Sequence, residues 1–184
     1  MERLIAVNSI EDIPSKYKES PIGLLLEYHN LNRQYEKYDS ASLLIGMCMD
    51  NRKHLHIPDN FAFIIRSGGA NLRYSEFKVS YALSVGGAKA IALIGHTHCA
   101  MVNLVARKEQ FIAGLVNNAG WTETAAEEHF MNFAPMFEIE NEIDFVLSEV
   151  KRLRRRYPNI LVAPFIYRLE DNKLYLVNET GEKK

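Results

Sequence analysis

The sequence predicts an α/β fold in which a mainly parallel β-sheet is flanked by helices. Short, continuous apolar runs of the length of buried strands alternate along the chain with longer segments whose apolar residues recur at helical spacing. The chain has 184 residues, of which 47% are hydrophobic, and this suffices for one domain with a substantial core. We therefore expect a single domain over residues 1–184, with an N-terminal helical arm over about residues 1–40 and an α/β core over about residues 41–180.

The first third of the chain predicts one helix and two strands. Residues 21–38 carry apolar side chains at near-helical spacing with charges between them, which indicates an amphipathic helix. The runs 41–47 and 61–65 are continuously apolar. Such runs suit central strands that are buried on both faces of a sheet.

A second helix and a third strand follow. Residues 74–85 alternate apolar and polar positions and end at Gly86 and Gly87, where a helix can stop. The run 90–94 predicts the third strand, and the succession of strand, helix and strand implies a right-handed parallel crossover. We expect the first and third strands to be neighbours, with the second strand on the far side of the first.

The second half of the chain predicts three helices and a final pair of strands. The helices are expected over residues 108–118, 124–133 and 139–156, and the second opens with Thr124 and Glu127 at the spacing of a capping box. The run 160–167 predicts a fourth strand beside the third. Asp171 and Asn172 make a turn into residues 174–177, so the fifth strand is expected to be antiparallel. The predicted strand order is 2-1-3-4, with strand 5 at the sheet edge.

Charge and hydropathy argue against two classes of partner. The formal net charge is −1, so the chain has no general attraction for nucleic acid or for an anionic membrane surface. The basic residues among 151–156 are expected to solvate the last turn of a helix. No stretch approaches the roughly 18 apolar residues of a membrane span, and the N-terminus has no secretory pattern. We expect a cytoplasmic protein with a small neutral or anionic substrate.

The reactive side chains gather in two short motifs that follow predicted strands. Cys48 follows the first strand, whereas His96 and Cys99 follow the third, so two sulfurs and one imidazole can meet at one end of the sheet. Zinc binds thiolate sulfur and imidazole nitrogen tetrahedrally, and three protein ligands leave a fourth position open in catalytic sites. We predict that these residues bind Zn²⁺ and that His98 points elsewhere. The alternative is a disulfide between Cys48 and Cys99, which is uncommon in a reducing compartment.

Asp50 and Arg52 lie within four residues of the first cysteine. A surface ion pair between them would contribute little by itself. Beside a metal, the Asp50 carboxylate can orient a metal-bound nucleophile while Arg52 keeps the carboxylate ionised and in place. If Arg52 released it, Asp50 could instead take the fourth metal position and close the site. The pair is therefore predicted to be catalytic and able to act as a switch.

At these residues the chain resembles the β-class carbonic anhydrases. The matching parts are Cys48-x-Asp50-x-Arg52, a strand ending in Arg66, a glycine-rich turn with Asn71, and Gly95-His96-x-x-Cys99. The resemblance implies zinc held by Cys48, His96 and Cys99, an Asp50 and Arg52 dyad, and a parallel sheet with an antiparallel edge strand. It also implies an obligate homodimer or higher homo-oligomer whose active sites lie near the subunit interface. Gly68, Gly69 and Asn71 are expected to line the substrate pocket.

The activity that this resemblance implies is the reversible, zinc-dependent hydration of carbon dioxide to bicarbonate. Zinc lowers the pKa of its bound water, and the resulting hydroxide attacks the carbon atom. Two alternatives stay open. The turn over residues 66–71 is one residue longer than the family pattern, which could reshape a narrow apolar pocket and favour carbonyl sulfide or carbon disulfide as the substrate. The other alternative is a zinc-binding interaction module without catalysis, in which Asp50 or another residue closes the metal site.

Overall fold

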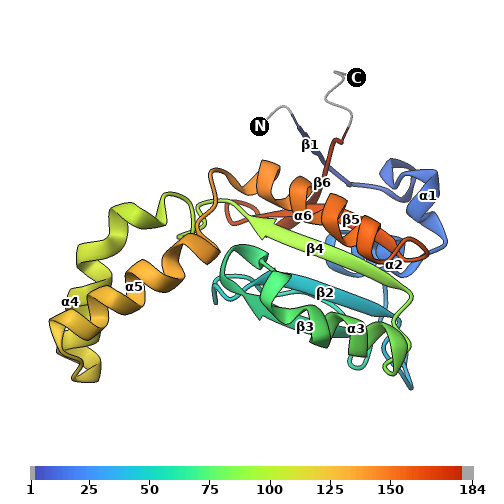
Figure 1. The fold of residues 1–184 in the computed structure, drawn as a ribbon. Helices are drawn as coiled ribbons and strands as arrows, with labels where there is room; N and C mark the ends of the chain where they lie inside the picture. Colours follow the sequence, from blue (N-terminus) through green and yellow to red (C-terminus); the bar gives the residue numbers. More distant parts are fainter. Residues whose placement is uncertain (1–2, 180–184) are drawn as a thin grey trace.

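The computed structural model describes residues 3–179, which form a six-stranded sheet with helices on both faces (Figure 1). The strands are β1 (Leu4–Ile5), β2 (Leu43–Cys48), β3 (Ala62–Ser67), β4 (Ala90–His96), β5 (Leu161–Arg168) and β6 (Lys173–Val177). They lie in the order β1-β6-β5-β4-β2-β3. Strands β3, β2, β4 and β5 are parallel, whereas β6 is antiparallel to β5 and β1 is antiparallel to β6. The predicted α/β class is confirmed.

One edge of the sheet and the burial of β3 differ from the prediction. The relative order of the five predicted strands is confirmed, but the fifth is not the edge, because β1 pairs with it through Leu4 and Val177. A two-residue strand is too short to show the periodicity that marks a strand in a sequence. The prediction that the run 61–65 is buried on both faces is wrong. Phe63 and Ile64 of β3 are 38% and 45% exposed, because β3 is itself an edge strand.

Six α-helices and four 3₁₀ segments connect the described strands. The α-helices are α1 (Ser15–Lys18), α2 (Pro21–Leu31), α3 (Glu76–Ser84), α4 (Lys108–Ala119), α5 (Glu123–Phe137) and α6 (Glu142–Arg156). The 3₁₀ segments are η1 (Ile10–Asp12), η2 (Gly68–Ala70), η3 (Arg73–Ser75) and η4 (Leu104–Arg107). The predicted helix over residues 21–38 is too long. It ends at Leu31, because Asn32 adopts a φ of 54° and an α-helix cannot continue through that conformation.

The N-terminal caps decide where α5 and α6 begin. The Thr122 hydroxyl accepts a hydrogen bond from the Ala125 N–H at 3.3 Å, so α5 starts after Thr122, and the capping box predicted at Thr124 is wrong. The Asn141 side-chain oxygen accepts a bond from the Asp144 N–H at 2.8 Å, and α6 accordingly starts at Glu142 rather than at residue 139. Local capping therefore overrides the apolar periodicity at both helix starts.

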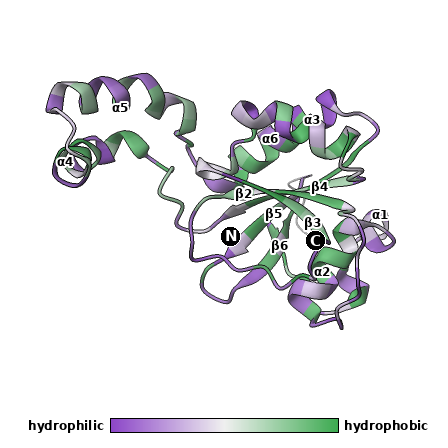
Figure 2. Ribbon diagram, turned by 90° about the horizontal axis from the view of Figure 1, so that it is seen from below, coloured by the Kyte–Doolittle hydropathy of each residue, from purple (hydrophilic) through white to green (hydrophobic). Residues whose placement is uncertain are grey.

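The helices sandwich the sheet. Helices α1 and α2 lie on one face, and α3 and α6 lie on the other (Figure 2). Alternate side chains of each strand enter the two cores, as β2 illustrates: Ile45 packs with the cluster under α2, whereas Leu44 packs with the cluster under α3 and α6. Every residue of β2 and of β4 is buried. Packing on both faces therefore fixes the positions of the residues at the ends of these two neighbouring strands.

Helices α4 and α5 form a hairpin, residues 108–137, that projects away from the sheet (Figures 1 and 2). Helix α4 has no buried residue, and α5 buries only Ala126, Phe130 and Ala134. Among the helices of residues 3–179, none combines the length and the apolar character that a membrane crossing requires.

Candidate metal centre

The ends of two adjacent parallel strands bring the predicted metal ligands together. Cys48 is the last residue of β2 and His96 is the last residue of β4, and the two strands pair in register through Met47 and Ile94. Cys99 lies in the turn that follows β4. The two sulfur atoms and a ring nitrogen of His96 all lie within 4.8 Å of one another, and all three residues are buried. The arrangement can hold a metal ion.

The two thiols are close but not bonded. Cys48 Sγ and Cys99 Sγ are 3.9 Å apart, much farther than the roughly 2.05 Å of a disulfide bond. The hydrogen bond with Cys99 is the main factor that holds the pKa of the Cys48 thiol well below its usual range, and His96 adds to it. The same hydrogen bond, together with burial, raises the pKa of Cys99. A metal ion binds the deprotonated sulfurs, so metal binding must release any proton that the pair holds.

His96 presents a free nitrogen to the two sulfurs. Its side chain is 0% exposed, and its Nδ1 lies 2.9 Å from the Thr97 carbonyl oxygen, so Nδ1–H donates and Nε2 is left as the acceptor. Among the described residues, Nε2 has no hydrogen-bond partner. A buried polar atom without a partner is unfavourable unless a ligand occupies its lone pair. The donor set of two sulfurs and one imidazole nitrogen fits zinc, which prefers these ligands.

Asp50 is held beside this cluster by Arg52. The Arg52 Nε donates to both carboxylate oxygens at 3.0 and 3.1 Å, Nη2 donates to Oδ2 at 2.6 Å, and the Arg52 N–H donates to Oδ1 at 2.9 Å. These bonds hold the pKa of Asp50 well below its usual range, so the carboxylate is ionised at neutral pH. Its Oδ2 lies 3.9 Å from His96 Nε2. The same Nη2 donates to the His98 carbonyl oxygen at 3.2 Å and so connects the two motifs.

The turn that carries Cys99 is anchored by two glutamates that the sequence analysis missed. Glu142 Oε1 accepts a hydrogen bond from the Cys99 N–H at 3.1 Å. Glu170 accepts from the Thr97 hydroxyl at 2.9 Å, and its Oε1 lies 3.0 Å from His98 Nε2. His98 points away from the cluster, as predicted, and its side chain is 73% exposed. Neither glutamate has a local signal in the sequence, because each is more than 40 residues from the turn.

The three residues expected in the substrate pocket have different surroundings. Gly68 lines an apolar cavity, and Gly69 adopts a φ of 62°, which favours glycine. Asn71 is buried, and both of its polar groups already have protein partners. Its Nδ2 donates to the Met136 carbonyl oxygen at 2.8 Å, and its Oδ1 accepts from the Arg73 N–H at 3.0 Å. The substrate-binding role of this turn stays a prediction.

The cavity beside Gly68 lies between the metal centre and the hairpin. Its volume is about 360 Å³, and apolar side chains dominate its lining. Met49 follows the candidate ligand Cys48, and Met101 packs against the cluster of Cys48, Cys99 and Ile139 and also lines the cavity. Phe130 and Phe133 of α5 form its far side. An apolar cavity therefore lies between the hairpin and residues that adjoin the ligand cluster.

Comparisons with solved structures identify proteins of the same fold. The structure is similar to a β-carbonic anhydrase, isoform I, from Trichomonas vaginalis, with a TM-score of 0.63 and 18% identity, covering 81% of this chain and 91% of that one. A carbonic anhydrase from Glaciozyma antarctica has a TM-score of 0.58 and 21% identity, covering 74% of this chain and 83% of that one. For a carbon disulfide hydrolase in its apo form the TM-score is 0.56 and the identity 19%, covering 79% and 85%. No family model matches the sequence, and curated proteins give no significant match. The chain has the β-carbonic anhydrase fold.

Proposed function

We propose that the protein is a zinc-dependent carbonic anhydrase that hydrates carbon dioxide reversibly to bicarbonate. One observation carries the proposal: Cys48, His96 and Cys99 place three buried ligand atoms within 4.8 Å of one another, beside an aspartate that an arginine holds. The fold shared with carbonic anhydrases supports it. A zinc ion would be held by the two sulfurs and by His96 Nε2, and it supplies a water-derived nucleophile by lowering the pKa of the water it binds.

Asp50 and Arg52 would orient the reactants. The Asp50 Oδ2 lies 3.9 Å from His96 Nε2, which places an ionised acceptor at the edge of the ligand cluster. The Asp50 carboxylate can accept a hydrogen bond from the nucleophile and so direct the lone pair of the nucleophile at the substrate carbon. Arg52 binds both carboxylate oxygens and prevents the carboxylate from turning toward the ligand cluster.

Carbonyl sulfide or carbon disulfide is the second candidate substrate. The observation that favours it is the apolar cavity of about 360 Å³ beside the metal centre, lined by Met101, Phe130 and Phe133 among others. A cavity of this kind favours an uncharged apolar molecule over an anion. The similarity to a carbon disulfide hydrolase is consistent with this alternative.

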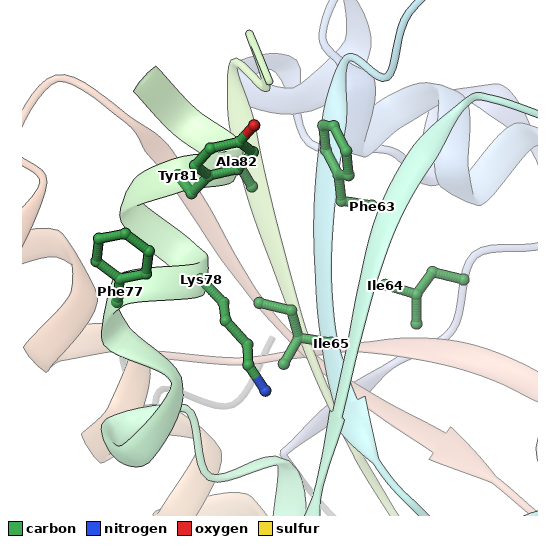
Figure 3. Close-up of a pocket in the computed structure, with 7 residues that line it drawn as sticks. All are labelled: Phe63, Ile64, Ile65, Phe77, Lys78, Tyr81 and Ala82. Carbon is green, nitrogen blue, oxygen red and sulfur yellow. The ribbon is translucent and has the colours of Figure 1, made fainter. Parts of the chain in front are cut away.

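We also propose that the protein is a homodimer or a higher homo-oligomer. Strand β3 leaves a backbone edge open, and α3 places exposed apolar side chains beside it: Phe77 is 81% exposed and Tyr81 is 53% exposed. Residues of α3 and β3 line a hollow of about 300 Å³ (Figure 3). A second copy of the chain would cover this face. Sedimentation of Phe77→Lys should show weaker self-association than the wild type, and unchanged association would contradict the use of this face.

A reducing compartment such as the cytoplasm suits the metal centre. The sulfurs of Cys48 and Cys99 are 3.9 Å apart, so a modest movement would join them in a disulfide under oxidising conditions. That bond would remove two of the three metal ligands. We therefore assign the activity to the cytoplasm.

The decisive experiment is stopped-flow hydration of carbon dioxide by protein whose zinc content has been measured. We expect turnover that rises toward alkaline pH, since two thiolates weaken the acidifying effect of zinc. Cys48→Ser should lose both zinc and activity. Asp50→Asn should keep zinc but lose about 10- to 100-fold in rate, the usual effect of removing a group that orients metal chemistry. Asp59→Asn, at an exposed aspartate outside the centre, is the matched control and should behave as the wild type.

The alternatives predict other results in the same assay. Faster turnover of carbonyl sulfide or carbon disulfide than of carbon dioxide would assign the centre to the second candidate. Bound zinc with no turnover of any of the three gases, even at high pH, would contradict both enzymatic proposals. It would support the zinc-binding interaction module instead.

A further inference from the structure

Lys53 is a buried cation beside the metal centre. Its side chain is 0% exposed, whereas the adjacent Arg52 side chain is 51% exposed. A lysine is almost never fully buried unless other groups pair with its charge, because moving an ammonium out of water is unfavourable. The partners of Lys53 must therefore explain its position.

Both partners of Lys53 belong to Asp50. The Lys53 Nζ donates a hydrogen bond to the Asp50 carbonyl oxygen at 2.9 Å and lies 3.9 Å from the Asp50 carboxylate oxygen Oδ1. Arg66 assists from β3, since its Nη1 donates to the Cys48 and Asp50 carbonyl oxygens at 3.3 and 3.4 Å. Asp50 is thus held twice: Arg52 binds its carboxylate from the solvent side, and Lys53 binds its main chain from the interior.

The groups that favour the charge of Lys53 belong to the candidate metal centre. Burial lowers the pKa of Lys53 and the nearby cation Arg66 lowers it further, whereas Cys48, Asp50 and Cys99 act in the opposite direction. An apolar side chain of the same length would fill this space without burying a charge. A lysine in this position indicates that its bond to Asp50 and its charge are used by the site.

We propose that Lys53 is a positioning residue that keeps the Asp50 carboxylate on Arg52 and away from the three metal ligands. Asp50 Oδ2 is only 3.9 Å from His96 Nε2, so a small rotation of the turn would bring the carboxylate onto the metal position. Lys53 opposes that rotation by fixing the Asp50 carbonyl oxygen and by attracting Oδ1. The inference rests on the proposed metal centre, and it identifies what holds that centre open.

Cobalt-substituted protein tests this role without any measurement of turnover. The visible bands of Co²⁺ report its ligands, and thiocyanate serves as a probe that enters an open coordination position. We expect thiocyanate to shift the bands of the wild type. In Lys53→Met the bands should differ from those of the wild type before any addition, and the affinity for thiocyanate should fall at least tenfold, since the Asp50 carboxylate then competes for the position. The double variant Lys53→Met/Asp50→Asn should recover thiocyanate binding, because an amide is a poor competitor.

The controls separate a positioning role from a merely structural one. Lys89→Met removes an exposed lysine that immediately precedes β4 and should bind thiocyanate as the wild type does. If Lys53→Met fails to fold, Lys53→Gln, which keeps a polar group but removes the charge, must still weaken thiocyanate binding. Wild-type affinity in whichever Lys53 variant folds, or wild-type bands that ignore thiocyanate, would overturn the proposal. Protein that responds to thiocyanate but does not hydrate carbon dioxide would overturn the proposed function and leave the role of Lys53 intact.

Discussion

Two regions of the molecule differ in how they are packed. One is the end of the sheet at Cys48 and His96, and the other is the hairpin of α4 and α5. Every residue of β2 and β4 is buried, so packing on both faces of the sheet fixes where these strands end. Helix α4 has no buried residue, and the hairpin projects away from the sheet (Figure 2) with Phe111, Met131 and Phe133 exposed. The core of the single chain therefore holds the ligand cluster in place. The hairpin, in contrast, gains little stability from that core.

A histidine in each region gives the sharpest contrast. We expect His96→Gln to lower zinc affinity by more than about 100-fold, because removal of groups that merely support a metal ligand already costs about 10- to 100-fold. His129→Gln, in the hairpin, should leave zinc affinity unchanged. Competition against a chromophoric chelator measures both. Equal zinc affinity in the two variants would remove His96 from the metal centre.

Near the same end of the sheet, protonation of His29 in α2 should lower the free energy of unfolding in acid. This buried histidine accepts a hydrogen bond from the His56 N–H at 3.1 Å on Nδ1, and its Nε2 lies 3.0 Å from the Asn172 carbonyl oxygen. Burial, with a smaller effect of His56, lowers the pKa of His29 to about 4 from 6.5. Between these two values the unfolded chain binds a proton that the folded chain does not. The free energy of unfolding should therefore fall by about 3 kcal/mol as the pH falls from 6.5 to 4.

Urea unfolding at several pH values measures this loss, and His29→Gln isolates it from the titration of carboxylates. The variant should be less stable than the wild type at pH 7 but should lose less stability on acidification. Parallel pH dependence in the two proteins would show that His29 is not responsible.

Alanine substitutions at two glycines, one in each region, test how tightly the two regions are packed. A Cβ atom at Gly95, one residue before His96, would lie 2.8 Å from Val146 Cγ2 and 3.0 Å from Ile166 Cδ1. Both neighbours are buried and cannot move freely, so Gly95→Ala should destabilise the protein by about 1–3 kcal/mol. Thermal unfolding followed by circular dichroism provides the measurement. A wild-type melting temperature would mean that α6 is packed less tightly on β4 than the structure indicates.

The corresponding change in the hairpin should have the smallest effect and the opposite sign. Nothing lies within 4 Å of a Cβ atom built at Gly114 in α4. Because alanine favours a helix more than glycine does, Gly114→Ala should stabilise the hairpin by about 0.5–1 kcal/mol. The same melting experiment applies. A loss of stability would show that the surface of α4 is covered by another part of the assembly.

The convergence of Cys48, His96 and Cys99 was predictable because these residues follow recognisable strands. The apolar runs before Cys48 and His96 predict two parallel neighbours, and parallel strands end at the same edge, so the convergence of their last residues follows from the order of the elements. The ion pair of Asp50 with Arg52 was equally predictable, because the two residues are only two positions apart. Each of these inferences depends on local pattern and on general rules of topology.

Other features depended on contacts between distant segments. The charge of Lys53 is typical of a surface residue, and only the folded chain buries it under Asp50. Glu142 reaches Cys99 across 43 residues of sequence. The pairing of β1 with β6 and the exposure of Phe63 and Ile64 on β3 are equally invisible in a local window.

Local sequence suffices to identify the strand-forming runs, most helix-forming segments and the donor atoms of the candidate metal centre, because side-chain periodicity and donor chemistry are properties of short segments. Contacts between distant segments settle which charges are buried, that β1 pairs with β6 and how the hairpin stands away from the sheet. These depend on which surfaces meet when the chain collapses. Burial and pairing are properties of the whole fold and not of any one segment.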